Sequence, residues 1–349
     1  MKPAFAALQP RHLLVRQTNW IGDAVMTTPA LAALRAHFPH SRIVVLANPL
    51  VAELFVHHPH VDAVLRYEKQ GCHGGVAGLW RLGRELRPQG FEAALLLQNA
   101  FEAALIARLA GIPWRAGYRT DGRGLLLSHG VARTAADKRR HHTDYYLELL
   151  RRLGLNAPAA PLLLACTSAE QDAARTLLAG QRPVAINPGA AYGSAKRWLP
   201  ERFAEVADAL ADRYGVPIVL TGGPNEQAIG ADIAAAMRFP VQNLIGRTSV
   251  RQLMALLQQC RLLVTNDSGP MHVAAAFGVP LVAVFGSTDH RTTSPLAANV
   301  RIVRQAVDCA PCLRRQCPTD HRCMTAISAE MVVAAACELL DGLSGEGAA

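Results

Sequence analysis

The sequence lacks several signatures that would assign it directly to a well-known class of protein. It contains no G-x-G-x-x-G between a predicted strand and helix, and no G-x-x-x-x-G-K-[ST]. Hydride transfer on a dinucleotide and P-loop ATP hydrolysis are therefore disfavoured. No two aspartates are two residues apart, so an Asp-x-Asp metal-binding pair is also missing. The longest stretch without a charge, 268–288, is interrupted by Gly278 and Pro280, which favours a helix followed by a buried strand over a membrane span.

Export and metal signals are equally weak. Residues 1–17 lack the continuous apolar stretch and the small-residue cleavage site of an export signal, so we expect a reduced, cytoplasmic setting for the eight cysteines. Zinc binding is one interpretation of the segment that places four of them as C-x2-C-x4-C-x5-C near His321. The second pair lacks the close spacing of a strong zinc site, so we expect buried or free thiols and no metal. The four are Cys309, Cys312, Cys317 and Cys323.

The excess positive charge is confined to the first half of the chain. Residues 1–165 contain 20 Lys and Arg against 11 Asp and Glu, whereas residues 166–349 contain 16 of each. A single basic cluster, such as 137–142, is most simply a solvated surface. The asymmetry of a whole half instead suggests an anionic partner, which could be nucleic acid, a phosphorylated lipid or a membrane surface.

Apolar strands alternate with amphipathic helices along both halves. Continuous apolar strands separated by such helices imply parallel sheets covered on both faces. With 349 residues, the chain suits two domains, and the Pro- and Ala-rich stretch 157–164 is a plausible connection. We therefore predict two doubly wound, Rossmann-like α/β domains that face each other across a cleft. The predicted domains are 1–160 and 165–327, with a C-terminal helix at about 328–345 that packs back on the first.

The stretch "NWIGDAVMTTPALAALR" (19–35) places Asp23 after a glycine and at the start of a predicted helix over 23–38. An aspartate here could simply cap the helix by accepting hydrogen bonds from backbone N–H groups. Alternatively, a carboxylate on a strand-to-helix turn lies where α/β proteins build active sites. The stretch by itself leaves both interpretations open.

Three predicted strand ends in the second half carry polar residues: "NPGAAYGSAKRW", "TGGPNE" and "TNDSGPMH". Loops at the carboxyl ends of parallel strands converge on one crevice, so all three could contact one ligand. In the third, Asp267-Ser268-Gly269 begins a helix whose free N–H groups attract phosphate, and Lys196 supplies a cation on the neighbouring loop. Asp267 and Ser268 could also be ordinary caps, but the three loops together favour phosphate binding.

Two further residues near these loops have competing interpretations. His272, one turn into the helix, is most simply a core histidine, so we give it at most a supporting role. Glu226 could accept hydrogen bonds from ribose hydroxyls, or it could be a solvated glutamate in a first helical turn.

Three motifs resemble those of the ADP-heptose:lipopolysaccharide heptosyltransferases: "NWIGDAVMTTPAL", "INPGAAYGSAKRWLPERF" and "TNDSGPMHVAAAFGVPLVAVFGST". The resemblance extends from about His12 to the cysteine segment, and "AKRWLPERF" is most similar to the heptosyltransferase II group. It implies a GT-B glycosyltransferase whose first domain binds the acceptor and whose second binds the donor. It also implies inverting transfer of L-glycero-D-manno-heptose from ADP-heptose to the lipid A-linked inner core, at the cytoplasmic face of the inner membrane.

The resemblance also implies roles for individual residues. Asp23 would be the general base, Lys196 the cation for the diphosphate, and the Asp267-Ser268-Gly269 turn would hold heptose hydroxyls and phosphate. Relatives often carry an acid where this chain has Ala191, and Tyr192 and Ser194 would substitute for it. The other residues expected to bind the donor are Gly189, His272 and Glu226. Those expected to bind the acceptor are Arg16, Asn19, Lys138, Arg139 and Arg140.

The chemistry of inverting transfer fits these residues. It needs a base for the acceptor proton and positive charge for the leaving diphosphate. Lys196 and a helix N-terminus can supply that charge, so we expect no cofactor and no required metal. The basic first half would then meet lipid A phosphates and inner-core carboxylates on an anionic membrane surface rather than nucleic acid. We expect the "NLIGRTSV" and "TGGPNE" loops to distinguish ADP from UDP sugars.

Other functions remain open at this point. Another heptosyltransferase of the same pathway would differ only in its acceptor, which the sequence does not identify. An epimerase on the same architecture would act on free nucleotide sugar and need no basic acceptor face. A non-catalytic nucleotide-sugar or lipid-binding protein would retain Lys196 but would not need Asp23.

Overall fold

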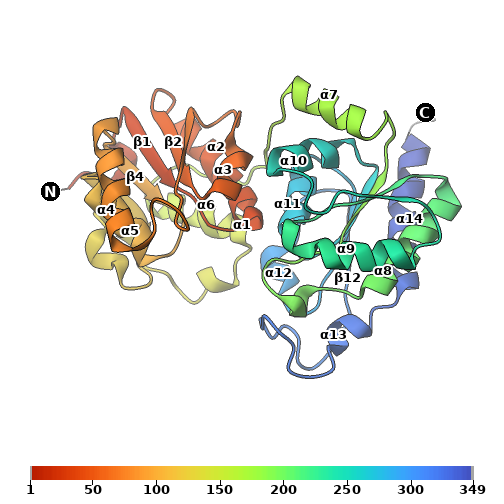
Figure 1. Ribbon diagram of the computed structural model, residues 1–349. Helices are drawn as coiled ribbons and strands as arrows, with labels where there is room; N and C mark the ends of the chain where they lie inside the picture. Colours follow the sequence, from red (N-terminus) through yellow and green to blue (C-terminus); the bar gives the residue numbers. More distant parts are fainter. Residues whose placement is uncertain (1, 347–349) are drawn as a thin grey trace. The chain divides into compact units, whose positions relative to one another are not determined.

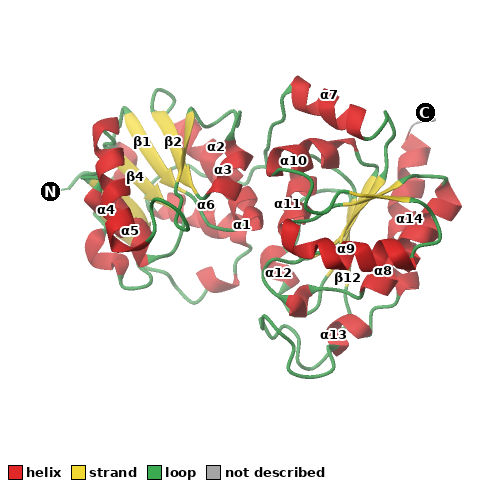
Figure 2. Cartoon of the chain, in the orientation of Figure 1, coloured by secondary structure: helices red, strands yellow, loops and turns green. Residues whose placement is uncertain are grey.

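The computed structural model describes residues 2–346, which divide into two compact units after Ala165. Each unit contains one six-stranded sheet in which every paired strand is parallel, with helices packed against it (Figure 1, Figure 2). The predicted doubly wound α/β fold is therefore confirmed for each half of the chain.

The first unit has the strand order β3-β2-β1-β4-β5-β6. Its central strands are buried on both sides, as expected for a parallel sheet covered by helices: Leu13, Leu14 and Val15 of β1 have no exposed surface. The strands are β1 (His12–Arg16), β2 (Arg42–Ala47), β3 (Ala63–Arg66), β4 (Ala93–Leu96), β5 (Trp114–Tyr118) and β6 (His129–Val131). The helices are α1 (Ile21–Met26), α2 (Thr28–His37), α3 (Pro49–Phe55), α4 (Gly75–Leu86), α5 (Phe101–Leu109) and α6 (His142–Arg152).

The helix predicted over 23–38 is divided into α1 and α2 at Thr27. The Thr27 hydroxyl donates to the carbonyl oxygen of Ala24 at 2.7 Å and accepts from the side chain of Gln17 at 2.8 Å. Pro29, in the first turn of α2, has no N–H with which to continue the α1 hydrogen-bond ladder. Competition from the threonine side chain and the missing donor together explain why the helix restarts here.

The second unit has the strand order β12-β11-β10-β7-β8-β9, which repeats the connectivity of the first. Its strands are β7 (Val184–Asn187), β8 (Ile218–Leu220), β9 (Val241–Asn243), β10 (Leu262–Asn266), β11 (Leu281–Val284) and β12 (Val300–Val303). Its helices are α7 (Ser168–Leu177), α8 (Pro200–Tyr214), α9 (Gln227–Ala236), α10 (Val250–Gln259), α11 (Gly269–Ala276), α12 (His290–Thr293), α13 (Arg322–Thr325) and α14 (Ala329–Glu346).

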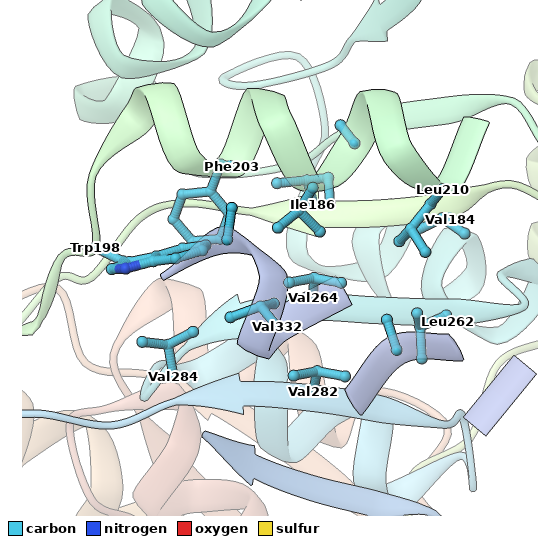
Figure 3. Close-up of a cluster of buried hydrophobic side chains, with 14 of the residues drawn as sticks. Val184, Ile186, Trp198, Phe203, Leu210, Leu262, Val264, Val282, Val284 and Val332 are labelled. Carbon is cyan, nitrogen blue, oxygen red and sulfur yellow. The ribbon is translucent and has the colours of Figure 1, made fainter. Parts of the chain in front are cut away.

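The C-terminal helix α14 belongs to the second unit. It packs against α8, β11 and β12, and its Val332, Ala336 and Leu340 are buried in the same core cluster as the sheet. Figure 3 shows Val332 among the side chains of this cluster. The expectation that residues 328–345 pack back on the first domain is therefore wrong. An amphipathic helix must cover some apolar surface, but its own sequence does not specify which sheet provides that surface.

The uncharged stretch 268–288 contains α11 and β11, as the sequence predicts. Within residues 2–346, none of the helices has the length and apolar character needed to cross a membrane.

Each unit has one point where the strand order reverses direction along the chain. In the first unit it lies between β1 and β4, and in the second between β7 and β10. Ligands of open parallel sheets bind at the carboxyl ends of the strands at this point, because the two flanking loops diverge and leave a crevice. Asp23 follows β1, while Gly189 and Asp267 follow β7 and β10, so the topology positions these residues at the two switch points.

The core of the second unit offers a stability test. Phe203 is fully buried and packs edge-on against Trp198, with ring centroids 5.0 Å apart (Figure 3). Phe203→Ala should lower the free energy of unfolding of this unit by about 3–5 kcal/mol, because it leaves a cavity. Urea unfolding measures this loss, with Leu177→Ala on exposed α7 as the control that should change little. A loss equal to that of the control would contradict the packing described here.

Candidate active site

Lys196 and Asp267 form a buried ion pair at the switch point of the second unit. The Lys196 ammonium lies 2.7 Å from Oδ2 of Asp267, and the two side chains are only 14% and 5% exposed. The same Oδ2 accepts a hydrogen bond from the Thr288 hydroxyl at 2.6 Å. The short helical turn Ser194–Lys196 thus places the lysine against the residue that follows β10. An ammonium has three N–H donors, so Lys196 can still donate to a phosphate while it is paired with Asp267.

Ser268 and Asp267 are not side-chain caps of α11. Ser268 occupies the N-cap position, but its hydroxyl lies 3.3 Å from Oδ1 of Asn187 and 3.1 Å from the Thr265 hydroxyl. In the described part of the chain, the Ser268 side chain makes no capping hydrogen bond to the first-turn N–H groups of α11. With Gly269 as its first residue, this helix start leaves backbone donors and a positive dipole end available to an anion.

Glu226 lies directly against the glycine-rich ends of β7 and β8. Its Oε2 accepts from the backbone N–H of Gly223 at 2.7 Å. A Cβ added to Gly189 would lie 1.9 Å from Oε1 of Glu226, and one added to Gly222 would lie 2.7 Å from Oε2. The Glu226 carboxylate can therefore approach the backbone at both glycines, and any larger residue at either position would block it.

The segment 308–321 fixes the loop that carries Lys196. The Tyr192 hydroxyl donates to the carbonyl oxygen of Leu313 at 2.9 Å, and the Ala195 N–H donates to that of Arg315 at 3.0 Å. The Tyr192 ring lies near two cations, 5.2 Å from Nζ of Lys196 and 5.3 Å from Cζ of Arg315. Arg315 was not predicted from the sequence, although it is one of two adjacent arginines within the cysteine motif.

The four cysteines of the C-x2-C-x4-C-x5-C motif are all free thiols. Burial, with smaller contributions from the other three thiols, raises the pKa of Cys323 to about 11. A hydrogen bond from Thr319 lowers the pKa of Cys317. Across residues 2–346, no group of three or more Cys, His, Asp or Glu side chains is arranged to hold a metal ion. His321 instead uses Nε2 to contact the carbonyl oxygen of Ala195 at 3.0 Å.

Two other residues expected to bind the donor, Ser194 and His272, differ from each other in exposure. Ser194 is exposed at the start of the short turn that ends at Lys196. His272 lies one turn into α11 and is 3% exposed, which fits the core role considered in the sequence analysis.

Asp23 is the third residue of α1 and does not cap it. The N-cap position belongs to Trp20, whereas the Asp23 side chain points to a histidine of another helix. Oδ1 of Asp23 lies 3.0 Å from Nδ1 of His142, and the two side chains are 27% and 40% exposed. Because an ionised carboxylate only accepts hydrogen bonds, this contact places the imidazole proton on Nδ1. Asp23 is thus accessible, oriented and able to accept a proton at its remaining oxygen lone pairs.

His142 was missed by the sequence analysis because it lies 119 residues from Asp23. It begins α6, and in the sequence it is the last residue of a basic cluster with no local sign of a carboxylate partner.

Arg16, which was expected to bind the acceptor, lies buried beneath the loop 17–20. Its side chain is 1% exposed, and burial lowers its pKa to about 10. Its Nη2 donates to Oδ1 of Asn19 at 3.1 Å, and Asn48 donates to the Asn19 carbonyl oxygen at 2.9 Å. A ligand cannot reach Arg16 directly, so its contribution is to hold the loop 17–20.

The basic cluster contains both paired and unpaired cations. Arg140 lies 2.9 Å from Asp144 and 3.5 Å from Asp137, so its charge is largely balanced within the fold. Lys138 and Arg139 are exposed and form no ion pair with any described residue. They are the members of the cluster that remain available to an anionic ligand.

Comparison with known proteins places this geometry in a family. The sequence model of the protein family described as "Glycosyltransferase family 9 (heptosyltransferase)" matches residues 79–322. The chain belongs to this heptosyltransferase family. It is 33% identical to lipopolysaccharide heptosyltransferase 2 of Escherichia coli over 307 residues, which cover 84% of this chain and 87% of that protein. The resemblance to the heptosyltransferase II group in the sequence analysis is thereby confirmed.

Solved structures of the family share the fold. Heptosyltransferase II of E. coli superposes with a TM-score of 0.82 at 29% identity, covering 95% of this chain and 99% of that one. A family 9 glycosyltransferase from Veillonella parvula gives 0.86 at 25% identity, covering 98% and 99%. Family membership favours glycosyl transfer over the epimerase and the non-catalytic binding protein.

Lys196→Ala tests the phosphate-binding role of the second switch point. Removing the ammonium should weaken ADP binding by about 10- to 100-fold, the scale of one charge-assisted hydrogen bond. Isothermal titration of ADP measures the change. Arg175→Ala, which removes an exposed cation of α7 paired with Asp172, is the matched control and should bind ADP normally. Equal ADP affinity in both variants would exclude Lys196 from the site.

Proposed function

We propose that the chain transfers L-glycero-D-manno-heptose from ADP-heptose to the lipid A-linked inner core, with inversion, as a heptosyltransferase II. Family membership and the relatives named heptosyltransferase 2 support this reaction. The observation that carries the chemistry is the Asp23–His142 contact, because it gives the first switch point an accessible carboxylate held in one orientation.

The second unit would hold the donor. The diphosphate would accept hydrogen bonds from Lys196 and from the first-turn N–H groups of α11, and these charges would stabilise it as it leaves. Glu226 would accept from ribose hydroxyls beside Gly189, where the backbone allows close approach. Tyr192 and Ser194 would take the place of the acid that relatives carry at Ala191, and His272 would support α11 from within the core.

The first unit would supply the base. As the acceptor oxygen bonds to the anomeric carbon, its proton passes to Asp23 and the bond from that carbon to the diphosphate oxygen breaks, releasing ADP. His142 would donate a hydrogen bond from its Nδ1–H to Asp23, fixing which oxygen faces the acceptor. No step in this scheme requires a metal, since cationic and backbone donors cover the leaving group.

The acceptor would be bound by groups beside Asp23. Asn19 is held in place by Arg16 and Asn48, and Lys138 and Arg139 can pair with phosphates or carboxylates of the inner core. Arg140 would act indirectly, by holding the start of α6 through Asp144. Since lipid A is anchored in a bilayer, we also propose that the protein is cytoplasmic and works at the anionic inner-membrane surface.

A transfer assay tests the proposal as a whole. The protein should convert a panel of truncated lipid A acceptors only where one heptose is already present, with a mass increase of one heptose. ADP-heptose should serve as donor, whereas a UDP-sugar should give no product, because unpaired base contacts are costly. Transfer to the acceptor that lacks heptose would instead identify another heptosyltransferase of the pathway. Absence of transfer to every acceptor would refute the proposal.

Asp23→Asn tests the base. The amide keeps the size of the side chain and can still contact His142, but it cannot accept the acceptor proton. The turnover number should fall by about 100-fold or more, the usual scale for loss of a general base, while ADP affinity stays the same. Steady-state kinetics and ADP titration provide the two measurements.

Asp121→Asn is the matched control, since Asp121 is an exposed aspartate of the same unit in a turn that asparagine also tolerates. It should transfer heptose at the parental rate. If Asp23→Asn did so as well, the base would have to be another residue.

A further inference from the structure

The exposed large apolar side chains of the first unit gather at one edge of its sheet. Six such side chains are exposed by 46–99%. Five of them directly follow the carboxyl end of a strand or lie in the first two turns of the helix that follows it. These five, which we call the apolar edge, are Trp20, Leu50, Val76, Trp80 and Phe101. The sixth, Leu125, lies on the crossover between β5 and β6.

The apolar edge has two parts: Trp20 and Leu50 lie at the starts of α1 and α3, which pack together, and the other members lie on α4 and α5, which also pack together. Its members follow β3, β2, β1 and β4, which are neighbours in the sheet and span about 14 Å at the usual strand spacing. Asn48, before Leu50, donates to the Asn19 carbonyl oxygen beside Trp20. Lys69, in the loop before α4, pairs with Glu102 beside Phe101 at 2.7 Å. Helix starts at this edge usually carry small polar caps, so large apolar residues here require an explanation.

Helix α4 presents the most exposed part of the apolar edge. Val76 and Trp80, one turn apart, are 74% and 55% exposed, while Leu82 and Leu86 of the same helix are buried against the unit. Figure 1 shows α4 beside α5, with which it packs. The outer face forms a shallow groove of about 860 Å³. Its lining residues are Val76, Ala77, Trp80, Arg81, Arg84 and Glu85.

Cations accompany this apolar surface. Arg81 and Arg84 are exposed beside Trp80 and form no ion pair with any described residue, whereas Glu85 is paired with His73 at 2.9 Å. Lys138 and Arg139 follow β6 at the same edge of the sheet and are also unpaired. A helix face that combines Trp and Val with arginines fits the boundary of an anionic bilayer, where the rings enter the acyl region and the guanidinium groups reach phosphates.

We propose that the apolar edge docks the first unit onto an anionic lipid bilayer, with Val76 and Trp80 inserted and Arg81 and Arg84 at the headgroups. The inference rests on the proposed function in one respect, namely that the acceptor is anchored in a membrane. Asp23 follows β1 at the same edge of the sheet. Docking at this edge would therefore bring Asp23, the proposed base, to the membrane surface that displays the acceptor. An acidic protein partner is the alternative occupant that the experiment must exclude.

Flotation with lipid vesicles tests the proposal. The purified full chain should bind vesicles that contain an anionic phospholipid and bind purely zwitterionic vesicles weakly. The double variant Val76→Ser, Trp80→Ser should bind anionic vesicles at least about tenfold less, because it removes the apolar contact. Arg81→Gln and Arg84→Gln should each weaken binding about fivefold. Leu177→Ser, which changes a 41% exposed leucine of α7, should bind as the parent does.

Two further measurements make the outcome decisive. The double variant should keep the parental unfolding midpoint and the parental rate on a delipidated, water-soluble acceptor, but lose rate on acceptor embedded in vesicles. Failure of the parent to bind anionic vesicles, or binding by the double variant equal to that of Leu177→Ser, would overturn docking. Either of these two results would favour an acidic protein as the occupant of the groove. If vesicle binding followed the expected pattern while no acceptor was ever glycosylated, the proposed function would fail and docking would stand.

Discussion

A single buried amide holds the second switch point together. Asn266, the last residue of β10, accepts a hydrogen bond from the backbone N–H of Trp198 at 3.0 Å and donates to the Pro188 carbonyl oxygen at 2.7 Å. The loop 188–198 is therefore fastened at both ends to one fully buried side chain. Lys196 lies between these two anchors, and Asp267 is the next residue along the chain. Since a buried amide left unpaired costs about 1–3 kcal/mol, the loop has one strongly favoured position.

The two carboxylates at the switch points, Asp267 and Asp23, have different surroundings. Asp267 is 5% exposed and already bound by an ammonium and a hydroxyl, so it acts as a fixed counter-charge for Lys196. Asp23 is 27% exposed and contacts one imidazole, so solvent or a sugar hydroxyl can reach its remaining lone pairs. The same functional group is thus a buried, paired anion in one unit and a solvent-accessible carboxylate in the other.

The sequence predicted whatever depended on local pattern and missed what depended on distant contacts. The alternation of apolar strands and amphipathic helices was enough to predict the two parallel sheets. The polar residues after the predicted strands were enough to predict that Lys196 and Asp267 lie close together. The position of α14 could not be predicted, because an apolar helix face does not itself specify which sheet it covers. His142 and Arg315 were missed for the same reason: each acts on a residue more than a hundred positions away along the chain.

The positive charge of the first unit illustrates the same limit. Two of its arginines, Arg16 and Arg123, are buried and bonded to backbone carbonyls and to Asn19 or Asn99, and burial lowers the pKa of each to about 10. Arg140, Arg151 and Arg152 instead share Asp137, Asp144 and Glu148. The count of charges therefore sets the overall attraction for an anion, but the position of the unpaired cations sets where that anion binds. Two of the unpaired cations, Lys138 and Arg139, follow β6 at the sheet edge that also carries Asp23.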